Sequence, residues 1–185
     1  MKGLVFREFI DLVEAKFGDD IVDEIIEAAD LPSGGAYTAV GTYPHSEMVS
    51  LVVELSRAVE LPVDTLLEVF GHYLANDVFA NKYASFFTEA GTTIEMLKKV
   101  EDHIHIEVMK LYPDAELPSF VFVASEDNRH EFRYESSRDM APLADGLIKG
   151  TAAVFEETIE VEYESHVNDG AKFTRFFVTT PADGT

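Results

Sequence analysis

The hydrophobic periodicity of this 185-residue chain changes at Pro118, and this change limits the folds open to it. Before Pro118, apolar residues recur every three to four positions, which predicts helices. After Pro118, apolar and polar residues alternate, as they do in strands with one buried face. We therefore expect a helical part followed by an antiparallel sheet, which is an α+β arrangement.

Helices are expected over most of residues 1–112. Gly18 ends the first one, and the acidic pair that follows can cap the second. Thr92 with Glu95 predicts the capped start of a long helix that runs to about Tyr112.

Four strands are expected after Pro118. They cover about residues 120–123, 132–136, 159–164 and 173–180. A helix from about Ala141 to Phe155 is inserted between the second and third strands. Asn168-Asp169-Gly170 predicts a tight hairpin turn, and the tail from Pro181 is expected to fray.

Charge and composition exclude several classes of function. Asp and Glu total 35 against 14 Lys and Arg, which gives a net charge of −21. Such a polyanion is poorly suited to nucleic acid or to an anionic membrane surface, because binding would bring like charges together. The absence of Cys excludes disulfides, thiolate catalysis and Cys-ligated zinc or haem. No apolar stretch is long enough to span a membrane and no signal peptide is recognisable, so we expect a cytoplasmic protein.

Two histidines on the expected long helix are candidate metal ligands. His103 and His105 lie about 200° apart around a helix, so they cannot face the same centre. Ile104, Val108 and Met109 give His105 apolar neighbours, whereas charged residues flank His103. A lone His on an apolar face is more often a core residue than a ligand. Because the chain has no Cys, a haem iron would have to be held by His, Met or Tyr.

Tyr134, Ser136 and Arg138 form the second candidate group. On an extended strand their side chains would point to the same face. Two hydroxyls and a guanidinium in a row are suited to a carboxylate or phosphate. The alternative interpretation is three ordinary polar residues on a solvated strand.

Together these motifs resemble the H-NOX family, the haem–nitric oxide/oxygen binding domains related to the sensor domain of soluble guanylate cyclase. The resemblance rests on His105 in His-Ile-His-Ile-Glu-Val-Met, on Pro118, and on the Tyr-x-Ser-x-Arg of residues 134–138. It covers essentially the whole chain. It implies a single domain over residues 1–185, with a helical lobe over about 1–60, a haem-binding lobe over about 61–185, and haem b between the lobes.

The resemblance also implies roles for individual residues. The family residue that matches His105 is the only protein ligand of the haem iron. Tyr134, Ser136 and Arg138 match residues that bond the haem propionates, and Pro118 matches a proline that packs on the macrocycle. Further haem contacts are expected from Met109 and, on the distal side, from Val5, Phe9, Leu74 and Phe79. Each of these apolar residues also has a plain interpretation as a core residue.

The distal residue that governs gas selectivity is expected to be Leu143. Oxygen-binding members place a Tyr in the helix after Tyr-x-Ser-x-Arg, and its hydroxyl donates to dioxygen. Leu143 takes that place here, counting back from Gly146. The sequence therefore predicts a nitric oxide sensor that excludes oxygen, with carbon monoxide as a further gas ligand. Nitric oxide is expected to weaken the bond from His105 to iron and so to move one lobe relative to the other.

We expect a bacterial, monomeric sensor rather than an enzyme. The chain ends at Thr185 without an output domain, so it is expected to signal in trans to a partner. The family precedents are a histidine kinase and a cyclic-di-GMP enzyme. Three alternatives stay open: an oxygen-binding haem protein, a peroxidase-like haem enzyme, and a haem-free module that docks a basic partner.

Overall fold

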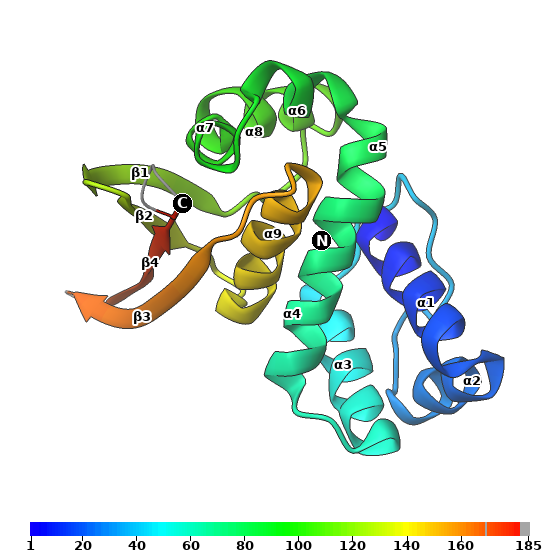
Figure 1. Ribbon diagram of the computed structural model, residues 1–185. Helices are drawn as coiled ribbons and strands as arrows, with labels where there is room; N and C mark the ends of the chain where they lie inside the picture. Colours follow the sequence, from blue (N-terminus) through cyan, green and yellow to red (C-terminus); the bar gives the residue numbers. More distant parts are fainter. Residues whose placement is uncertain (169, 182–185) are drawn as a thin grey trace. The chain divides into compact units, whose positions relative to one another are not determined.

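The computed structural model describes residues 1–168 and 170–181 (Figure 1). The chain divides into two compact units, residues 1–70 and 71–185. The family resemblance implied lobes over about 1–60 and 61–185; the division between the two compact units falls inside helix α4 (Val63–Tyr73). None of the described helices combines the length and the hydrophobicity that crossing a bilayer requires.

The first unit consists of α1 (Gly3–Phe17), α2 (Asp19–Ala28), α3 (His45–Val59) and the first part of α4. Gly18 ends α1 as predicted, with a φ of +88° that suits a residue without Cβ. The expected acidic cap of α2 is wrong: the cap position is Gly18 itself, and Asp19 and Asp20 lie in the first turn. There their charges favour the helix dipole instead.

The loop between α2 and α3 is held by one buried carboxylate. Glu47 on α3 is only 3% exposed. It accepts hydrogen bonds from the Ser33 hydroxyl and from the Tyr37 hydroxyl, the latter at 2.9 Å. The Tyr37 ring also stacks on Phe6 of α1 with ring centroids 4.3 Å apart. Because a buried carboxylate without donors is costly, these two hydroxyls fix the path of the loop.

The helices of the second unit before the sheet are short and are interrupted by π-helical turns, and a longer helix, α9, lies between the second and third strands. In chain order they are η1 (Leu74–Phe79), α5 (Ala80–Lys82), α6 (Ala84–Ala90), α7 (Thr93–Lys98), η2 (Val100–Ile104), α8 (His105–Leu111) and α9 (Ala141–Val154). The predicted cap of α7 is confirmed, since the Thr92 hydroxyl accepts from the Glu95 amide at 3.3 Å. The single long helix predicted from Thr92 is wrong in detail, because η2, a π-helical turn, divides it.

Four strands form one antiparallel sheet: β1 (Ser119–Glu126), β2 (Arg129–Glu135), β3 (Glu160–Asn168) and β4 (Ala171–Thr179). Their order across the sheet is β1-β2-β4-β3. The strand positions and the inserted α9 are as predicted. In the Asn168-Asp169-Gly170 turn, Asp169 lies outside the described residues, as do residues 182–185 of the tail.

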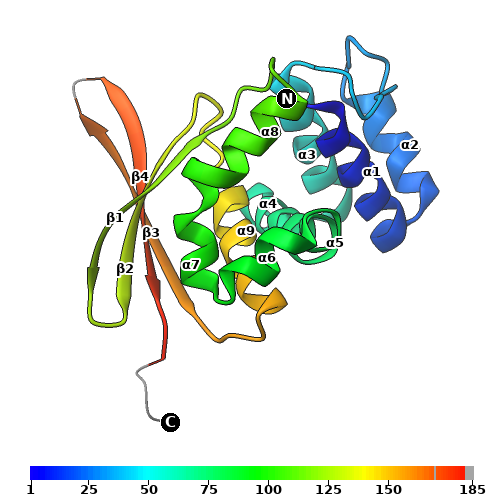
Figure 2. The ribbon, with the colours of Figure 1, turned by 90° about the horizontal axis from the view of Figure 1, so that it is seen from above.

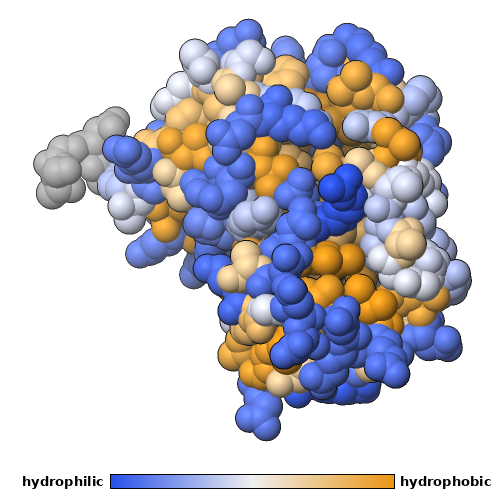
Figure 3. Space-filling view, turned by 90° about the vertical axis from the view of Figure 1, so that its right-hand side faces the viewer, coloured by the Kyte–Doolittle hydropathy of each residue, from blue (hydrophilic) through white to orange (hydrophobic). Residues whose placement is uncertain are grey.

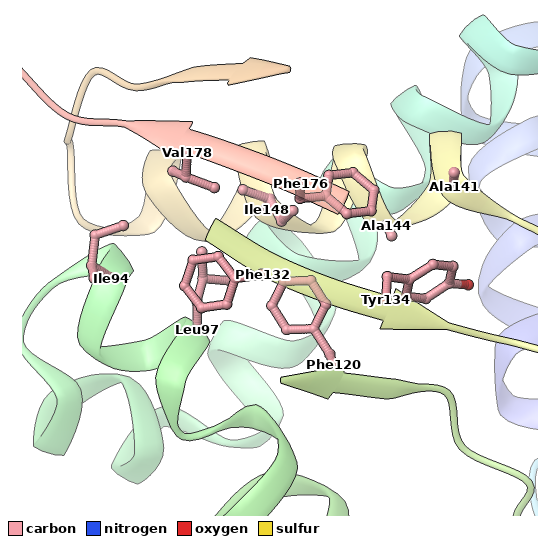
Figure 4. Packing of buried hydrophobic residues seen from close by; sticks show 10 residues of the cluster. All are labelled: Ile94, Leu97, Phe120, Phe132, Tyr134, Ala141, Ala144, Ile148, Phe176 and Val178. Carbon is pink, nitrogen blue, oxygen red and sulfur yellow. The ribbon is translucent and has the colours of Figure 1, made fainter. Parts of the chain in front are cut away.

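Helices α7 and α9 cover the same face of the sheet (Figure 2). The core between them contains Phe120 and Phe132, whose rings stack with centroids 5.0 Å apart. The other buried members of this cluster are Ile94, Leu97, Tyr134, Ala141, Ala144, Ile148, Phe176 and Val178 (Figure 4). Each large apolar side chain buried here contributes about 1.5–3 kcal/mol. The packing of these helices on the sheet therefore holds the residues at the edge of the core, such as Tyr134, in fixed positions.

Candidate functional site

His105 is the first residue of α8 and follows the π-helical turn η2 directly. Its side chain is 17% exposed, whereas His103 faces solvent, as the sequence predicted. Burial lowers the pKa of His105, and the nearby Glu101 opposes that shift more weakly. The ring is therefore neutral near pH 7 and keeps a nitrogen lone pair, which a metal ligand requires.

Glu101 links His105 to the beginning of β1. Its Oε2 atom lies 3.2 Å from Nδ1 of His105 and accepts the Phe120 amide hydrogen at 2.9 Å. Glu101 was not among the residues predicted from the sequence. Its spacing of four residues from His105 could have indicated the first contact. The contact with Phe120 depends on the tertiary fold and leaves no trace in the local sequence.

Tyr134, Ser136 and Arg138 lie close together, but not on one strand face as predicted. β2 ends at Glu135, and Ser136 and Arg138 belong to the turn that follows. The Ser136 hydroxyl accepts the Arg138 amide hydrogen at 3.2 Å, a local bond that replaces strand pairing.

Tyr134 is buried at the edge of the sheet core, with its hydroxyl turned away from Phe120 and Phe132 (Figure 4). Burial raises the pKa of Tyr134, and it outweighs the lowering effects of the Ser136 hydroxyl and the Arg138 charge. These effects show that the three polar groups converge. The Tyr134 hydroxyl thus stays protonated and can donate a hydrogen bond at neutral pH.

The Arg138 guanidinium is largely buried, with 12% of its side chain exposed. Nη2 donates to the Glu116 carbonyl oxygen at 2.7 Å. Nε has no hydrogen-bond partner within the described part of the chain. A buried cationic donor without an acceptor costs free energy, so this N–H suits an anionic group such as a carboxylate.

Pro118 lies in the connection between α8 and β1, and it is partly buried. Arg138 holds Glu116 on one side of it, and Glu101 holds Phe120 on the other. The 116–120 segment is therefore fixed at both ends. It joins the candidate iron ligand to the candidate anion-binding group.

Leu143 and Leu74 lie on two helices that cross closely, α9 and η1. A Cβ on Gly71 would lie 2.2 Å from the Leu143 carbonyl oxygen, and one on Gly150 would lie 2.5 Å from the His72 carbonyl oxygen. Such distances are below van der Waals contact, so glycine allows α9 to approach the end of α4, to which Gly71 and His72 belong. The backbone that carries Leu143 is thereby set against the end of α4, directly before η1.

The other apolar candidates differ in burial. Leu74 is buried, Phe79 is partly buried with its ring centroid 6.0 Å from that of Tyr83, and Met109 on α8 is exposed. In the first unit, Val5 is partly buried. Phe9 is fully buried and packs edge-on against Phe70, with centroids 5.2 Å apart, so within its own unit it is a core residue.

Comparison with known proteins decides which family these motifs belong to. A sequence profile described as Haem-NO-binding matches residues 2–163. The chain belongs to the haem–NO-binding family. The resemblance inferred from the sequence is therefore confirmed for this haem–NO-binding domain, whose family comprises haem-binding gas sensors.

Solved structures confirm the predicted α+β fold of the domain. An H-NOX protein from K. algicida, in its unliganded Fe(II) state, is 38% identical, covers 100% of this chain and 99% of its own, and has a TM-score of 0.91. An H-NOX protein from S. oneidensis in the Fe(II)NO state is 26% identical, covers 98% of this chain and 99% of its own, and has a TM-score of 0.88.

A curated relative is the soluble guanylate cyclase gcy-35 of Caenorhabditis elegans, 21% identical over 161 residues. The match covers 85% of this chain and 23% of that protein, so the chain spans about a quarter of the relative's length.

The residues of this haem–NO-binding domain fit a haem group. His105 offers a neutral ring nitrogen, which suits iron. Arg138 offers a buried N–H without an acceptor, and Tyr134 offers a protonated hydroxyl beside it, both of which suit a propionate.

Proposed function

We propose that this chain is a haem-based nitric oxide sensor that excludes oxygen. Membership of a haem-binding gas-sensor family supports the first half of the proposal. The observation that carries the second half is Leu143, an aliphatic residue on α9 where oxygen-binding members have a Tyr. When bound, haem b supplies a ferrous iron that takes up a diatomic gas, here nitric oxide and also carbon monoxide.

His105 would give its free ring nitrogen to the iron, and Arg138, Tyr134 and Ser136 would bind the propionates. Pro118 would pack on the porphyrin, held in place by the fixed ends of the 116–120 segment. Apolar contacts would come from Val5, Phe9, Leu74, Phe79, Met109 and Leu143. These roles together make the group a tightly held sensor cofactor.

Leu143 would set the gas selectivity, because its side chain has no hydrogen to donate. Oxygen binding gains much more from a nearby donor than nitric oxide binding does, since dioxygen takes on more negative charge. A pocket without that donor therefore favours nitric oxide. The close contact between Leu143 and Gly71 fixes the backbone that carries this side chain.

The output would pass to a separate protein, as H-NOX domains signal to partner proteins. A histidine kinase and a cyclic-di-GMP enzyme are the two partner classes proposed. A cytoplasmic location and a monomeric state remain predictions from the sequence.

An absorption spectrum of the purified ferrous protein tests the proposal. We expect a Soret band that shifts with nitric oxide and does not change in air to a stable oxygen-bound spectrum. A stable oxygen-bound spectrum would contradict the exclusion of oxygen. Leu143→Tyr should gain oxygen binding, and Leu147→Tyr, one turn along α9, is its matched control.

The variant His105→Ala tests the ligand assignment. It should purify with little haem unless free imidazole is added, because imidazole can replace the missing side chain. Haem content equal to that of the wild type, without imidazole, would show that another residue holds the iron.

A further inference from the structure

Glu101 is an acidic residue in contact with His105, and it makes two contacts. Its Oε2 atom faces Nδ1 of His105 at 3.2 Å and accepts the Phe120 amide hydrogen at 2.9 Å. A carboxylate accepts hydrogen bonds, so Nδ1 of His105 carries the ring hydrogen. Nε2 is then the ring nitrogen with the free lone pair.

We propose that Glu101 is a positioning residue for His105: it fixes the tautomer and the ring orientation, and it strengthens the bond that Nε2 makes to iron. This inference rests on the proposed function, because it takes His105 to be the iron ligand. A hydrogen bond from Nδ1 to a carboxylate makes an imidazole more electron-rich. Glu101 would thus set how firmly the chain holds the iron.

The second contact of Glu101 makes it a rigid support. Phe120 is buried, and its ring stacks on Phe132 at 5.0 Å with an angle of 9° between the planes. The amide that Glu101 accepts from therefore belongs to the sheet core. Because the same oxygen faces both partners, the His105 ring is held relative to β1 as well as to its own helix.

The backbone around Glu101 is unusual. It lies in η2, where the Ile104 amide bonds to the Lys99 carbonyl five residues earlier, at 3.2 Å. π-Helical turns are rare and are frequently found at functional sites. Here the turn carries Glu101 and ends immediately before His105, so it sets the offset between the two side chains.

The test compares Glu101→Gln with Glu107→Gln in the haem-loaded protein. Gln at position 101 keeps an oxygen for the Phe120 amide but loses the negative charge, so the fold is retained. Glu107 also lies close to His105 in sequence, two residues after it, but its carboxylate pairs with Lys110 on the surface. Each substitution therefore removes one negative charge near the site, but only Glu101→Gln changes the bond to Nδ1 of His105.

Two measurements are needed: the iron–histidine stretching frequency of the ferrous protein by resonance Raman, and the rate of haem transfer to apomyoglobin. We expect Glu101→Gln to lower the frequency and to speed haem transfer about 10- to 100-fold. Glu107→Gln should leave both at the wild-type values. Unchanged values in Glu101→Gln, or equal shifts in the two variants, would overturn the inference.

The variant His105→Ala separates this inference from the proposed function. If His105→Ala loses haem while Glu101→Gln behaves as the wild type, the ligand assignment stands and the role of Glu101 is wrong. If His105→Ala keeps its haem, the ligand assignment fails and the role of Glu101 fails with it.

Discussion

Arg138 differs from the arginines of the sheet in its burial and in having one unsatisfied donor. Arg129, Arg133 and Arg175 each lie over a Phe ring and pair with a Glu side chain. In those contacts the Glu side chains neutralise the arginine charges, and the arginines cover Phe rings of the sheet. Arg138 also lies near a carboxylate, that of Glu116 at 3.7 Å, and its Nη2 donates to the Glu116 carbonyl oxygen. Its side chain is largely buried, however, and its Nε has no acceptor among the described residues. This difference favours Arg138, among these four arginines, as the candidate for binding an anionic ligand.

Arg138→Ala should weaken haem retention. The variant loses a charge-assisted hydrogen bond, typically worth ~1.5–3 kcal/mol, which corresponds to roughly ten- to hundredfold faster haem loss. Transfer of haem to apomyoglobin measures this rate. Arg129→Ala, on the exposed side of the sheet, is the control and should transfer haem at the wild-type rate. Equal rates in the two variants would remove Arg138 from the site.

Tyr37 offers a pH readout of the loop that Glu47 holds. Burial raises the pKa of Tyr37 from 10.0 to about 12. Because the folded state favours the protonated phenol, this contribution to stability is complete below pH 10 and is lost as the pH rises toward 12. Burial also raises the pKa of Tyr83 and Tyr134, so the measurement must isolate Tyr37.

The measurement is an ultraviolet phenolate titration of the wild type and of Tyr37→Phe. Their difference should show one phenol that titrates near pH 12, and the wild type should lose thermal stability over that range. A difference curve centred at the ordinary value of 10.0 would show that Tyr37 is accessible to solvent.

At the scale of helices and strands, hydrophobic period predicted where elements lie, and local side-chain chemistry decided where they end. The period of two after Pro118 predicted β1 and β2. The same pattern predicted that β2 runs to Ser136, whereas the strand ends at Glu135. The Ser136 hydroxyl accepts the Arg138 amide hydrogen and so ends the strand, and the alternation of apolar and polar residues does not reveal this bond. The π-helical turn η2 could not be predicted from the sequence either, since its residues continue an ordinary helical pattern.

The candidate site shows the same division. The sequence could propose His105, Arg138 and Tyr134 as candidates, because motif spacing identifies residue types. The link from Glu101 to Phe120 was not, because it joins a helix to a strand 19 residues later through a backbone amide, and any residue but proline could supply that amide.

The crossing of α9 with α4 and η1 gives a prediction at this scale. Gly150→Ala would place a Cβ 2.5 Å from the His72 carbonyl oxygen, so the helices would have to move apart. Overpacking of this kind typically costs about 1–3 kcal/mol. Thermal unfolding measures the loss, and Ala153→Ser, at an exposed position on α9, is the control. An unchanged melting temperature in Gly150→Ala would mean that the helices are not in close contact.

At the scale of the whole molecule, the net charge of −21 is the dominant electrostatic feature. Figure 3 shows hydrophilic side chains spread between apolar patches on the face in view. Acidic residues outnumber basic ones by 35 to 14, so there are too few basic side chains for each carboxylate to have one of its own. Their mutual repulsion opposes the compact state.

Added salt should therefore stabilise the protein. The screening length falls to about 10 Å at 0.1 M ionic strength, which weakens repulsion between surface carboxylates more than it weakens buried contacts. The melting temperature should rise between low salt and 0.1 M sodium chloride. A fall in melting temperature would show that attractive ion pairs outweigh the repulsion.

The 116–120 segment limits insertions and deletions in this part of the chain. Surface connections usually tolerate changes in length at small cost. This one is bound at Glu116 by Arg138 and at Phe120 by Glu101, and each residue of an extended chain spans at most ~3.3–3.6 Å. Removing one residue between those points would force one of the two bonds to break. Loop exchange between H-NOX domains should therefore preserve the length of this connection, even where its sequence varies.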